Sequence, residues 1–250
     1  MTETFTLITI AGTFLLAGSI KGIIGLGLPI VSLGVLAIAL DLTTAMALML
    51  IPAFVSNMWQ ALVGGMGKII FQRIWPFLLM ATATIWFGSK ALTSINPLFL
   101  SMLLGILLAA YSTFNLIGFS LSISTKNEKW VGPVFGMVNG IFTGMTGSSV
   151  VPGVMFLQAI GLPRDMLVQA MGMLFCFSTI ALTFSLQNNN LLTTELTAIS
   201  ALAVVPAIMG MMIGQRVRKS LSETRFRKTF FVSIFLLGFF NIAKAVFSLN

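Results

Sequence analysis

Residues 18–29 read Gly-Ser-Ile-Lys-Gly-Ile-Ile-Gly-Leu-Gly-Leu-Pro, a glycine-rich run in the middle of a long apolar stretch, Phe5 to Leu40. As a single α-helix this stretch would measure about 54 Å, well beyond a hydrocarbon layer of about 30 Å. A second overlong stretch, Trp130 to Ile160, has a similar run in its middle, with Gly140, Gly144, Gly147 and then Pro152. Glycine and proline interrupt helices, so we expect each stretch to form a helix, a break and a second helix.

The composition indicates a membrane protein. Of the 250 residues, 57% are hydrophobic and 8% are charged, whereas soluble domains carry roughly 25% charged residues. The mean hydropathy is +1.03. Residues Met1 to Thr6 include Glu3 but no Lys or Arg, so they lack the basic start of a secretory signal peptide. We therefore expect the first apolar stretch to remain in the mature protein.

Further hydrophobic stretches follow the same pattern. They run from Leu42 to Gly67, Ile69 to Gly88, Asn96 to Phe119, Met166 to Leu186, Leu191 to Gly214 and Thr229 to Leu249. At roughly 20 apolar residues per crossing, the chain is expected to be an all-α polytopic membrane protein with about 8 to 10 transmembrane segments.

The same composition argues against an enzyme. The chain has no His, a single Cys at position 176 and six acidic residues, Glu3, Asp41, Glu128, Asp165, Glu195 and Glu223. Metal cages and catalytic triads need clusters of such groups, so we expect no catalytic residue, no metal site and no cofactor. The net charge of +8 comes without a soluble basic domain, so we expect no nucleic-acid partner and relate the charge to orientation in the bilayer.

Cationic residues concentrate in three segments between hydrophobic stretches. They are Lys68 with Arg73, Lys126 with Lys129, and the group Arg216, Arg218, Lys219, Arg225, Arg227 and Lys228, which we expect to form a loop between Gly214 and Thr229. Lys and Arg favour the cytoplasmic side. All three segments fall on that side only if each broken stretch makes an even number of passes, as a re-entrant hairpin or as two short crossings. Both termini then lie outside, and Lys90 alone disagrees.

The two halves of the chain resemble each other. Gly18 to Gly25 aligns with Gly136 to Gly144 with one inserted residue, and Ala37-Ile38-Ala39-Leu40 aligns with Ala159-Ile160-Gly161-Leu162. The same register pairs Met49 with Met171 and Ser56 with Ser178. Because the first half starts outside and the second inside, we expect two inverted-topology repeats, 1–124 and 125–250, each with a broken or re-entrant first helix and three spanning helices.

The breaks predict an anion site. A helix that restarts inside the membrane presents unpaired N–H groups and a positive dipole end. We expect restarts near Leu28 and near Ser148 and Ser149, meeting near the midplane of the membrane. Lys21 lies between apolar runs, and a charge there is costly unless it faces water or a partner. The alternatives are that Lys21 extends to the interface and that the glycines only let helices pack closely.

Other polar residues in the apolar stretches are candidates for the lining of this site. Lys21 corresponds to Asn139 in the repeat register; the others are Ser56, Asn57, Gln60, Gln158, Ser178 and Thr179. Taken alone, each of these residues more often makes an interhelical hydrogen bond. No acidic residue lies in the middle of a stretch, so a carboxylate proton relay is not expected, and Lys21 is interpreted as a charge partner of the substrate.

These glycine-rich runs, Gly18 to Pro29 and Gly136 to Pro152, and the basic segment before the last stretch resemble the TauE/SafE family of sulfite exporters over nearly the whole chain. The resemblance implies a bacterial or archaeal cytoplasmic-membrane transporter that moves sulfite, organosulfonates or similar anions outward. It implies an anion-site role for matching residues, Lys21, Gly25, Gly27, Gly144, Gly147, Ser148 and Ser149.

The leading hypothesis is thus a secondary transporter of small sulfur-containing anions, which bind between the two restarts. An anion channel could use the same broken helices as a filter, and an inverted-repeat drug or metabolite exporter would instead carry neutral or cationic substrates. Trp59, Trp75 and Trp86 are typical of lipid-interface anchors, with a homodimer face as the alternative.

Overall fold

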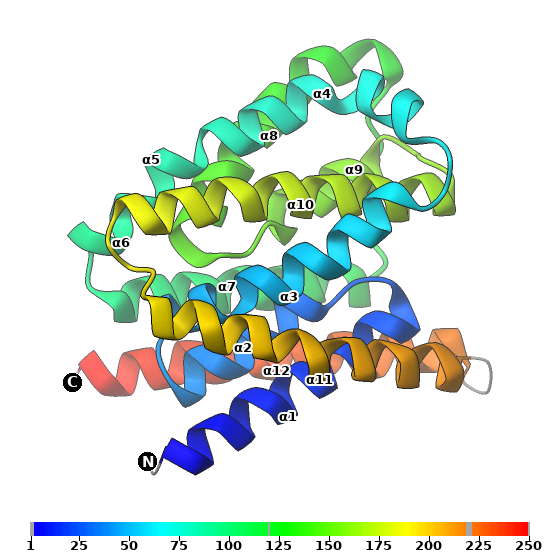
Figure 1. Ribbon diagram of the computed structural model, residues 1–250. Coiled ribbons are helices and arrows are strands. Elements are labelled where there is room, and N and C mark those ends of the chain that lie inside the picture. Colours follow the sequence, from blue (N-terminus) through cyan, green and yellow to red (C-terminus); the bar gives the residue numbers. More distant parts are fainter. Residues whose placement is uncertain (1–2, 120, 219–221, 250) are drawn as a thin grey trace. The chain divides into compact units, whose positions relative to one another are not determined.

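The computed structural model describes residues 3–119, 121–218 and 222–249, and these described residues form helices joined by short connections (Figure 1). In chain order the helices are α1 (Glu3–Ile24), α2 (Leu28–Ala39), α3 (Leu42–Leu62), α4 (Gly67–Ala83), α5 (Ile85–Ser89), α6 (Ala91–Ser94), α7 (Pro97–Leu116), α8 (Thr125–Thr146), the π-helical turn η1 (Val150–Val154), α9 (Met155–Ala159), α10 (Arg164–Asn188), α11 (Thr194–Arg218) and α12 (Glu223–Leu249). The predicted all-α architecture is confirmed.

Seven helical segments in the described part of the chain are long and apolar enough to cross a membrane. They are α1, α3, the run Gly67–Ser94 through α4 to α6, α7, α10, α11 and the stretch Thr224–Ser248 of α12. The chain is therefore a polytopic membrane protein.

Several helices extend further than the hydrophobic pattern predicts. Arg216 and Arg218 lie in the last turns of α11, and Arg225 to Lys228 lie in α12. The predicted loop from Gly214 to Thr229 is thus wrong for the described residues; Lys219 lies outside them. Cations at the C-terminus of α11 are favourable for its dipole, whereas those in the first turns of α12 are not. A helix can continue beyond the hydrocarbon layer, so charge does not end either helix.

Both predicted breaks are confirmed. α1 ends at Ile24 and α2 begins at Leu28, with Gly25 and Gly27 at φ of 87° and 123°. These are left-handed conformations that glycine adopts without a Cβ penalty. α8 ends at Gly147, which is left-handed at φ 76°, and Val151 is extended at φ −115° and ψ 124°. The second helix therefore becomes regular after the predicted serines, which lie within the break.

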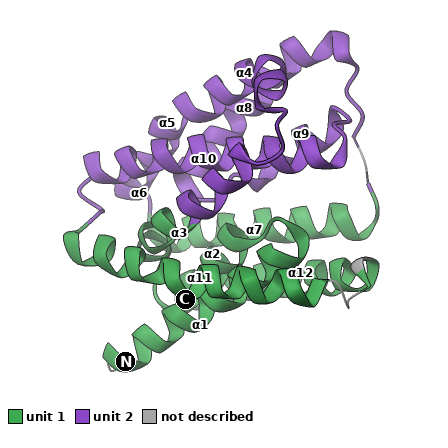
Figure 2. Ribbon diagram, turned by 45° about the vertical axis from the view of Figure 1, so that its right-hand side comes forward, with its two compact units in different colours: residues 1–52, 96–118, 193–250 green, residues 53–95, 119–192 purple. Residues whose placement is uncertain are grey.

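The chain forms two compact units, each with segments from both sequence halves (Figure 2). Unit 1 comprises residues 1–52, 96–118 and 193–250, and unit 2 comprises residues 53–95 and 119–192. Helix α3 passes from one unit to the other after Pro52. The predicted division into 1–124 and 125–250 concerns the sequence duplication, and together with the inverted topology it stays a prediction.

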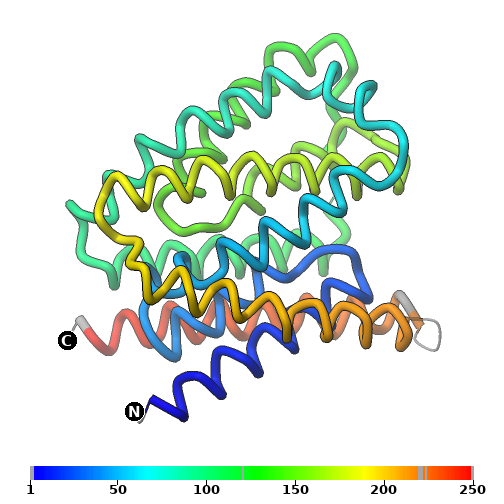
Figure 3. The backbone as a smooth tube through the Cα atoms, viewed as in Figure 1, coloured from blue at the N-terminus to red at the C-terminus, as the bar shows by residue number. Residues whose placement is uncertain are grey.

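In unit 1, α1 packs against α11, and α7 packs against α12. The N-terminal end of α1 and the C-terminal end of α12 lie together, opposite the end at which α11 stops and α12 starts (Figures 1 and 3). α2 runs back from the break, and Lys244, near the end of α12, donates to the carbonyl of Ile38 at 2.6 Å. The first broken segment is therefore a hairpin. Its second helix, of 12 residues or about 18 Å, is too short to cross a membrane alone.

In unit 2, α8 packs against α4 and α5. The chain just before α8 meets the end of α9, because Ile123 N–H donates to Ala159 O at 2.9 Å. Arg73 of α4 binds both ends of this segment: it contacts Glu128 at 2.8 and 2.6 Å and donates to Ile160 O at 2.7 Å. The second broken segment is thus also a hairpin that returns to the end at which it started.

Helix α3 contains Pro52 in its interior but is not broken there. Proline has no N–H, so within α3 it leaves the carbonyl of Leu48 without its usual partner. Ser200 of α11 donates its hydroxyl to that carbonyl at 2.8 Å, and its oxygen accepts from Ile51 N–H at 3.2 Å. The freed backbone groups are satisfied by a side chain, and α3 continues through Pro52.

Candidate anion site at the helix breaks

The break in unit 2 is lined by buried hydroxyl groups. Thr143, Thr146, Ser148 and Ser149 are each at most 5% exposed. The Thr143 hydroxyl lies 2.7 Å from the carbonyl oxygen of Asn139 and 2.9 Å from Ser149 Oγ, while Ser148 N–H donates to Thr146 Oγ1 at 3.3 Å. These contacts fix the conformation of the break and surround it with groups that can donate hydrogen bonds.

Asn139 connects α8 to the first turn of the second helix. Its Oδ1 accepts from Gly153 N–H at 2.9 Å. A backbone N–H can only donate, so the oxygen of the amide must face Gly153 and the Nδ2 group must point elsewhere. Within the described residues Nδ2 has no hydrogen-bond partner, although Asn139 is fully buried. The amide is thus held with its two N–H donors available to an acceptor.

Ser178 Oγ of unit 2 also has no hydrogen-bond partner among the described residues. Its side chain is 3% exposed. It lies one turn after Leu174 on α10, so the two side chains share a face, and the Leu174 side chain lies against Gly153 of the second helix. The face of α10 that carries Ser178 is therefore the face that packs on the restarted helix.

These features together suit an anion. Native proteins rarely leave buried polar groups unpaired, and an unsatisfied buried donor costs about 1 to 3 kcal/mol. Here Asn139 lies at the first turn of the restarted helix, whose N-terminus contributes roughly half a positive charge, and Ser178 lies on the face of α10 that packs on this helix. An oxyanion would accept from Asn139 Nδ2 and Ser178 Oγ and would be stabilised by the helix end.

The break in unit 1 is cationic rather than hydroxyl-rich. Lys21 lies in the last turn of α1 and is only 4% exposed. The interpretation in which it extends to the membrane surface is not supported by this burial. No side chain caps the start of α2 in the described structure, and Pro29 has no N–H to satisfy. The unit 1 break thus combines a buried lysine in the last turn of α1 with an uncapped start of α2, and an uncapped helix start favours an anion.

The first break does not lie beside the middle of the neighbouring helices α11 and α12. Gly22 faces the backbone of Met211 to Gln215, which lies in the last third of α11, and Gly27 lies against the ring of Phe230 near the start of α12. The reason is that α1 has 22 residues and is about 33 Å long by itself. Binding of substrate at the midplane between the two restarts stays a prediction.

The glycine stripes are used in helix packing. A Cβ on Gly18 or Gly22 would collide with backbone oxygens of α11, and a Cβ on Gly136 or Gly140 would collide with α4. The predicted site residue Gly144 belongs to this group, because a Cβ there would collide with Ile85 O of α5 and Ser89 N. Close helix packing therefore needs these glycines, and the site role of Gly144 stays a prediction. Gly25, Gly27 and Gly147 lie in the breaks themselves.

The other predicted lining residues are distributed among helices. Ser56 and Asn57 are buried in α3, where Ser56 Oγ donates to Ala53 O at 3.1 Å. Gln60 donates to Val168 O at 2.7 Å and so joins α3 to α10. Thr179 donates to Phe175 O of its own helix at 2.7 Å, and Gln158 is exposed. Gln60 thus makes the interhelical hydrogen bond that was the alternative, whereas the Thr179 bond lies within α10.

Thr143 and Thr146, whose hydroxyls also line the break, are not predicted as site residues from the sequence. Their spacing of three residues before two serines in an apolar stretch is the signal that could have found them. Sequence reasoning also misses the bidentate pair of Arg73 with Glu128, because their separation of 55 positions has no local pattern.

The fold and the two breaks define a class of protein: a polytopic α-helical membrane protein with discontinuous helices, a design typical of secondary transporters. Residues 10–240 match the family described as Sulfite exporter TauE/SafE, so the chain belongs to that family of transporters, which is not enzymatic. No curated protein and no solved structure gives a significant match.

Proposed function

We propose that this protein is a secondary transporter that exports small sulfur oxyanions, such as sulfite or organosulfonates, and binds them at its helix breaks. The observation that carries the proposal is the buried, unpartnered Asn139 Nδ2 at the restarted helix, with Ser178 Oγ, also unpartnered, on the face of α10 that packs on this helix. Sulfite and sulfonate groups carry several acceptor oxygens and no donor when ionised, which matches a site made of donors.

Lys21 supplies the positive charge in this proposal. A cation buried in the last turn of α1 in unit 1 gives the first break the same preference for anions. The sequence predicts that both breaks bind the same ion. A double-variant cycle of Lys21→Gln with Ser178→Ala tests this prediction. Coupling beyond additivity supports one shared ion, because distant independent sites add.

We further propose that the protein lies in the cytoplasmic membrane with its three basic segments inside and both termini outside. Family membership supports the membrane transporter, and the concentration of Lys and Arg supports the orientation. Trp59, Trp75 and Trp86 are 68%, 50% and 39% exposed, which suits rings at the membrane interface. The alternative of a homodimer face is tested by the mass of the purified protein in detergent.

The test is flux of radiolabelled sulfite and of a simple organosulfonate into proteoliposomes, with sulfate and chloride as comparison anions. The proposal predicts saturable flux of at least one sulfur anion. Ser178→Ala should raise the half-saturation concentration about 10-fold, the loss expected for one hydrogen bond to a charged group. Ser112→Ala is the matched control, since Ser112 is also buried but donates to Leu108 O of its own helix.

Two outcomes would contradict the proposal. If the folded protein gives no saturable flux of any sulfur anion, the proposed substrate class is wrong. Flux that stays linear in concentration, with single-channel currents, would favour the anion channel instead.

A further inference from the structure

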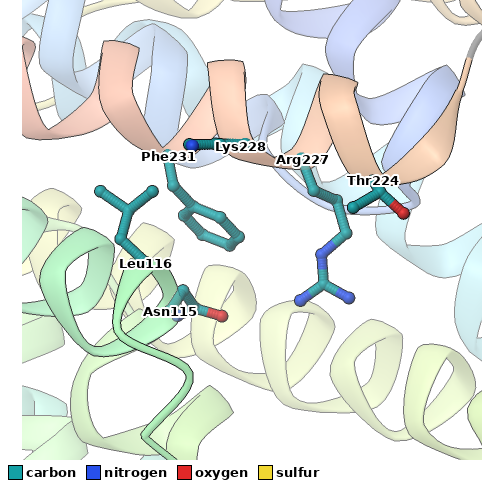
Figure 4. A pocket seen from close by; sticks show the side chains of 6 residues that line it. All are labelled: Asn115, Leu116, Thr224, Arg227, Lys228 and Phe231. Carbon is teal, nitrogen blue, oxygen red and sulfur yellow. The ribbon is translucent and has the colours of Figure 1, made fainter.

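A cavity of about 450 Å³ opens in unit 1 where the end of α7 meets the first turns of α12 (Figure 4). Its described lining consists of Asn115, Leu116, Thr224, Arg227, Lys228 and Phe231. This volume is within the range of small-molecule sites. None of these residues belongs to the proposed anion site at the breaks.

The lining combines cations with an aromatic floor. Phe231 is 4% exposed, and the guanidinium carbon of Arg227 lies 5.9 Å from the centre of its ring. Figure 4 shows the Phe231 ring between Leu116 and Arg227, with the Asn115 amide directed toward the guanidinium. A guanidinium over a ring keeps its N–H donors free of the ring. Arg227 can therefore still donate two hydrogen bonds to one oxyanion.

Exposed apolar side chains continue from one wall of the cavity. Leu116 is 38% exposed, and Ile117, which follows it, is 67% exposed. In a protein that crosses a membrane, such side chains meet lipid tails. The cavity therefore presents cations and hydrogen-bond donors next to a surface suited to acyl chains.

We propose that this cavity binds the phosphate headgroup of an anionic phospholipid, with the acyl chains along Leu116 and Ile117. Basic pockets between transmembrane helices are suited to such headgroups, and the cavity lies in the most basic part of the chain. The shared chemistry is a phosphate oxyanion, and the membrane rather than free phosphate is its source because of the adjoining apolar surface. This inference is independent of the proposed substrate.

The test is native mass spectrometry of the full chain in detergent with added phosphatidylglycerol or phosphatidylcholine. Wild type should retain phosphatidylglycerol preferentially. The double variant Arg227→Gln with Lys228→Gln should bind it about 30-fold more weakly, from the contribution expected of two cations near a membrane surface. The matched control, Arg216→Gln with Arg218→Gln, removes the same charge from exposed residues that do not line the cavity, and should change binding less than 3-fold.

A second variant keeps the proposal testable if the first is unstable. Thr224→Glu adds a negative charge to the cavity in the first turn of α12, where helices tolerate an acid well, and should also weaken phosphatidylglycerol binding. Equal losses in the lining pair and the control pair would overturn the proposal in favour of diffuse charge attraction. Displacement of the lipid by millimolar inorganic phosphate would overturn the lipid source.

Discussion

Replacing Asn139 by Asp tests the donor arrangement at the unit 2 break with almost no change of shape. The carboxylate can still accept from Gly153 N–H, as Oδ1 does at 2.9 Å, so the start of the second helix keeps its partner. The two Nδ2 donors, which have no partner among the described residues, are removed, and a negative charge takes their place.

The expected magnitude follows from the chemistry of the lost bond. A hydrogen bond to a charged group contributes about 1.5 to 3 kcal/mol, which corresponds to about a 10- to 150-fold change in affinity. Repulsion between two anions adds to this loss. We therefore expect Asn139→Asp to weaken sulfite binding by at least about 10-fold.

The assay is the concentration dependence of sulfite flux in proteoliposomes, with thermal unfolding of the purified variant as a check of folding. Asn189→Asp is the control, because it makes the same change at the end of α10, where the amide donates to Ser185 O. It should leave the half-saturation concentration unchanged. A folded Asn139→Asp variant with wild-type affinity would refute the reasoning.

Three further predictions concern stability. Gly18→Ala should lower the free energy of unfolding by about 1 to 3 kcal/mol through overpacking against α11. Gly12→Ala in the same helix, with open space around it, should be neutral or stabilising. Equal effects of the two substitutions would contradict close packing at Gly18. Glu128→Gln should cost about 1 to 3 kcal/mol because it breaks the ion pair with Arg73, while Glu195→Gln, at an exposed position, should cost less than 0.5 kcal/mol, roughly the surface value. Lys244→Met should lower stability by about 1 kcal/mol, since its bond to the end of α2 is lost; an unchanged thermal unfolding curve would argue against that bond.

The two breaks can be predicted from the sequence because glycine and proline act locally. Gly25 and Gly27 adopt left-handed backbone angles that other residues avoid, and Pro52 shows the limit of this rule. It lies inside α3 without a break, because Ser200, a residue 152 positions away from Leu48, binds the freed carbonyl. Such long-range compensation has no signal in the local pattern.

The roles of individual glycines are less accessible. Gly144 and Gly147 both lie in the same glycine-rich run, yet Gly144 contacts α5 and Gly147 ends α8. The difference depends on which helix packs alongside, and the sequence does not show that α8 meets α4 and α5. The orientation of the Asn139 amide is likewise set by a contact across 14 residues, formed only when the break folds.

The most direct test of the central claim is equilibrium binding of radiolabelled sulfite to the purified full chain, compared with Lys21→Gln and Asn139→Asp. We predict saturable binding, with a dissociation constant raised at least about 10-fold in Asn139→Asp and weaker binding in Lys21→Gln. Unchanged binding in both folded variants, or no binding of any sulfur anion by the folded wild type, would contradict it.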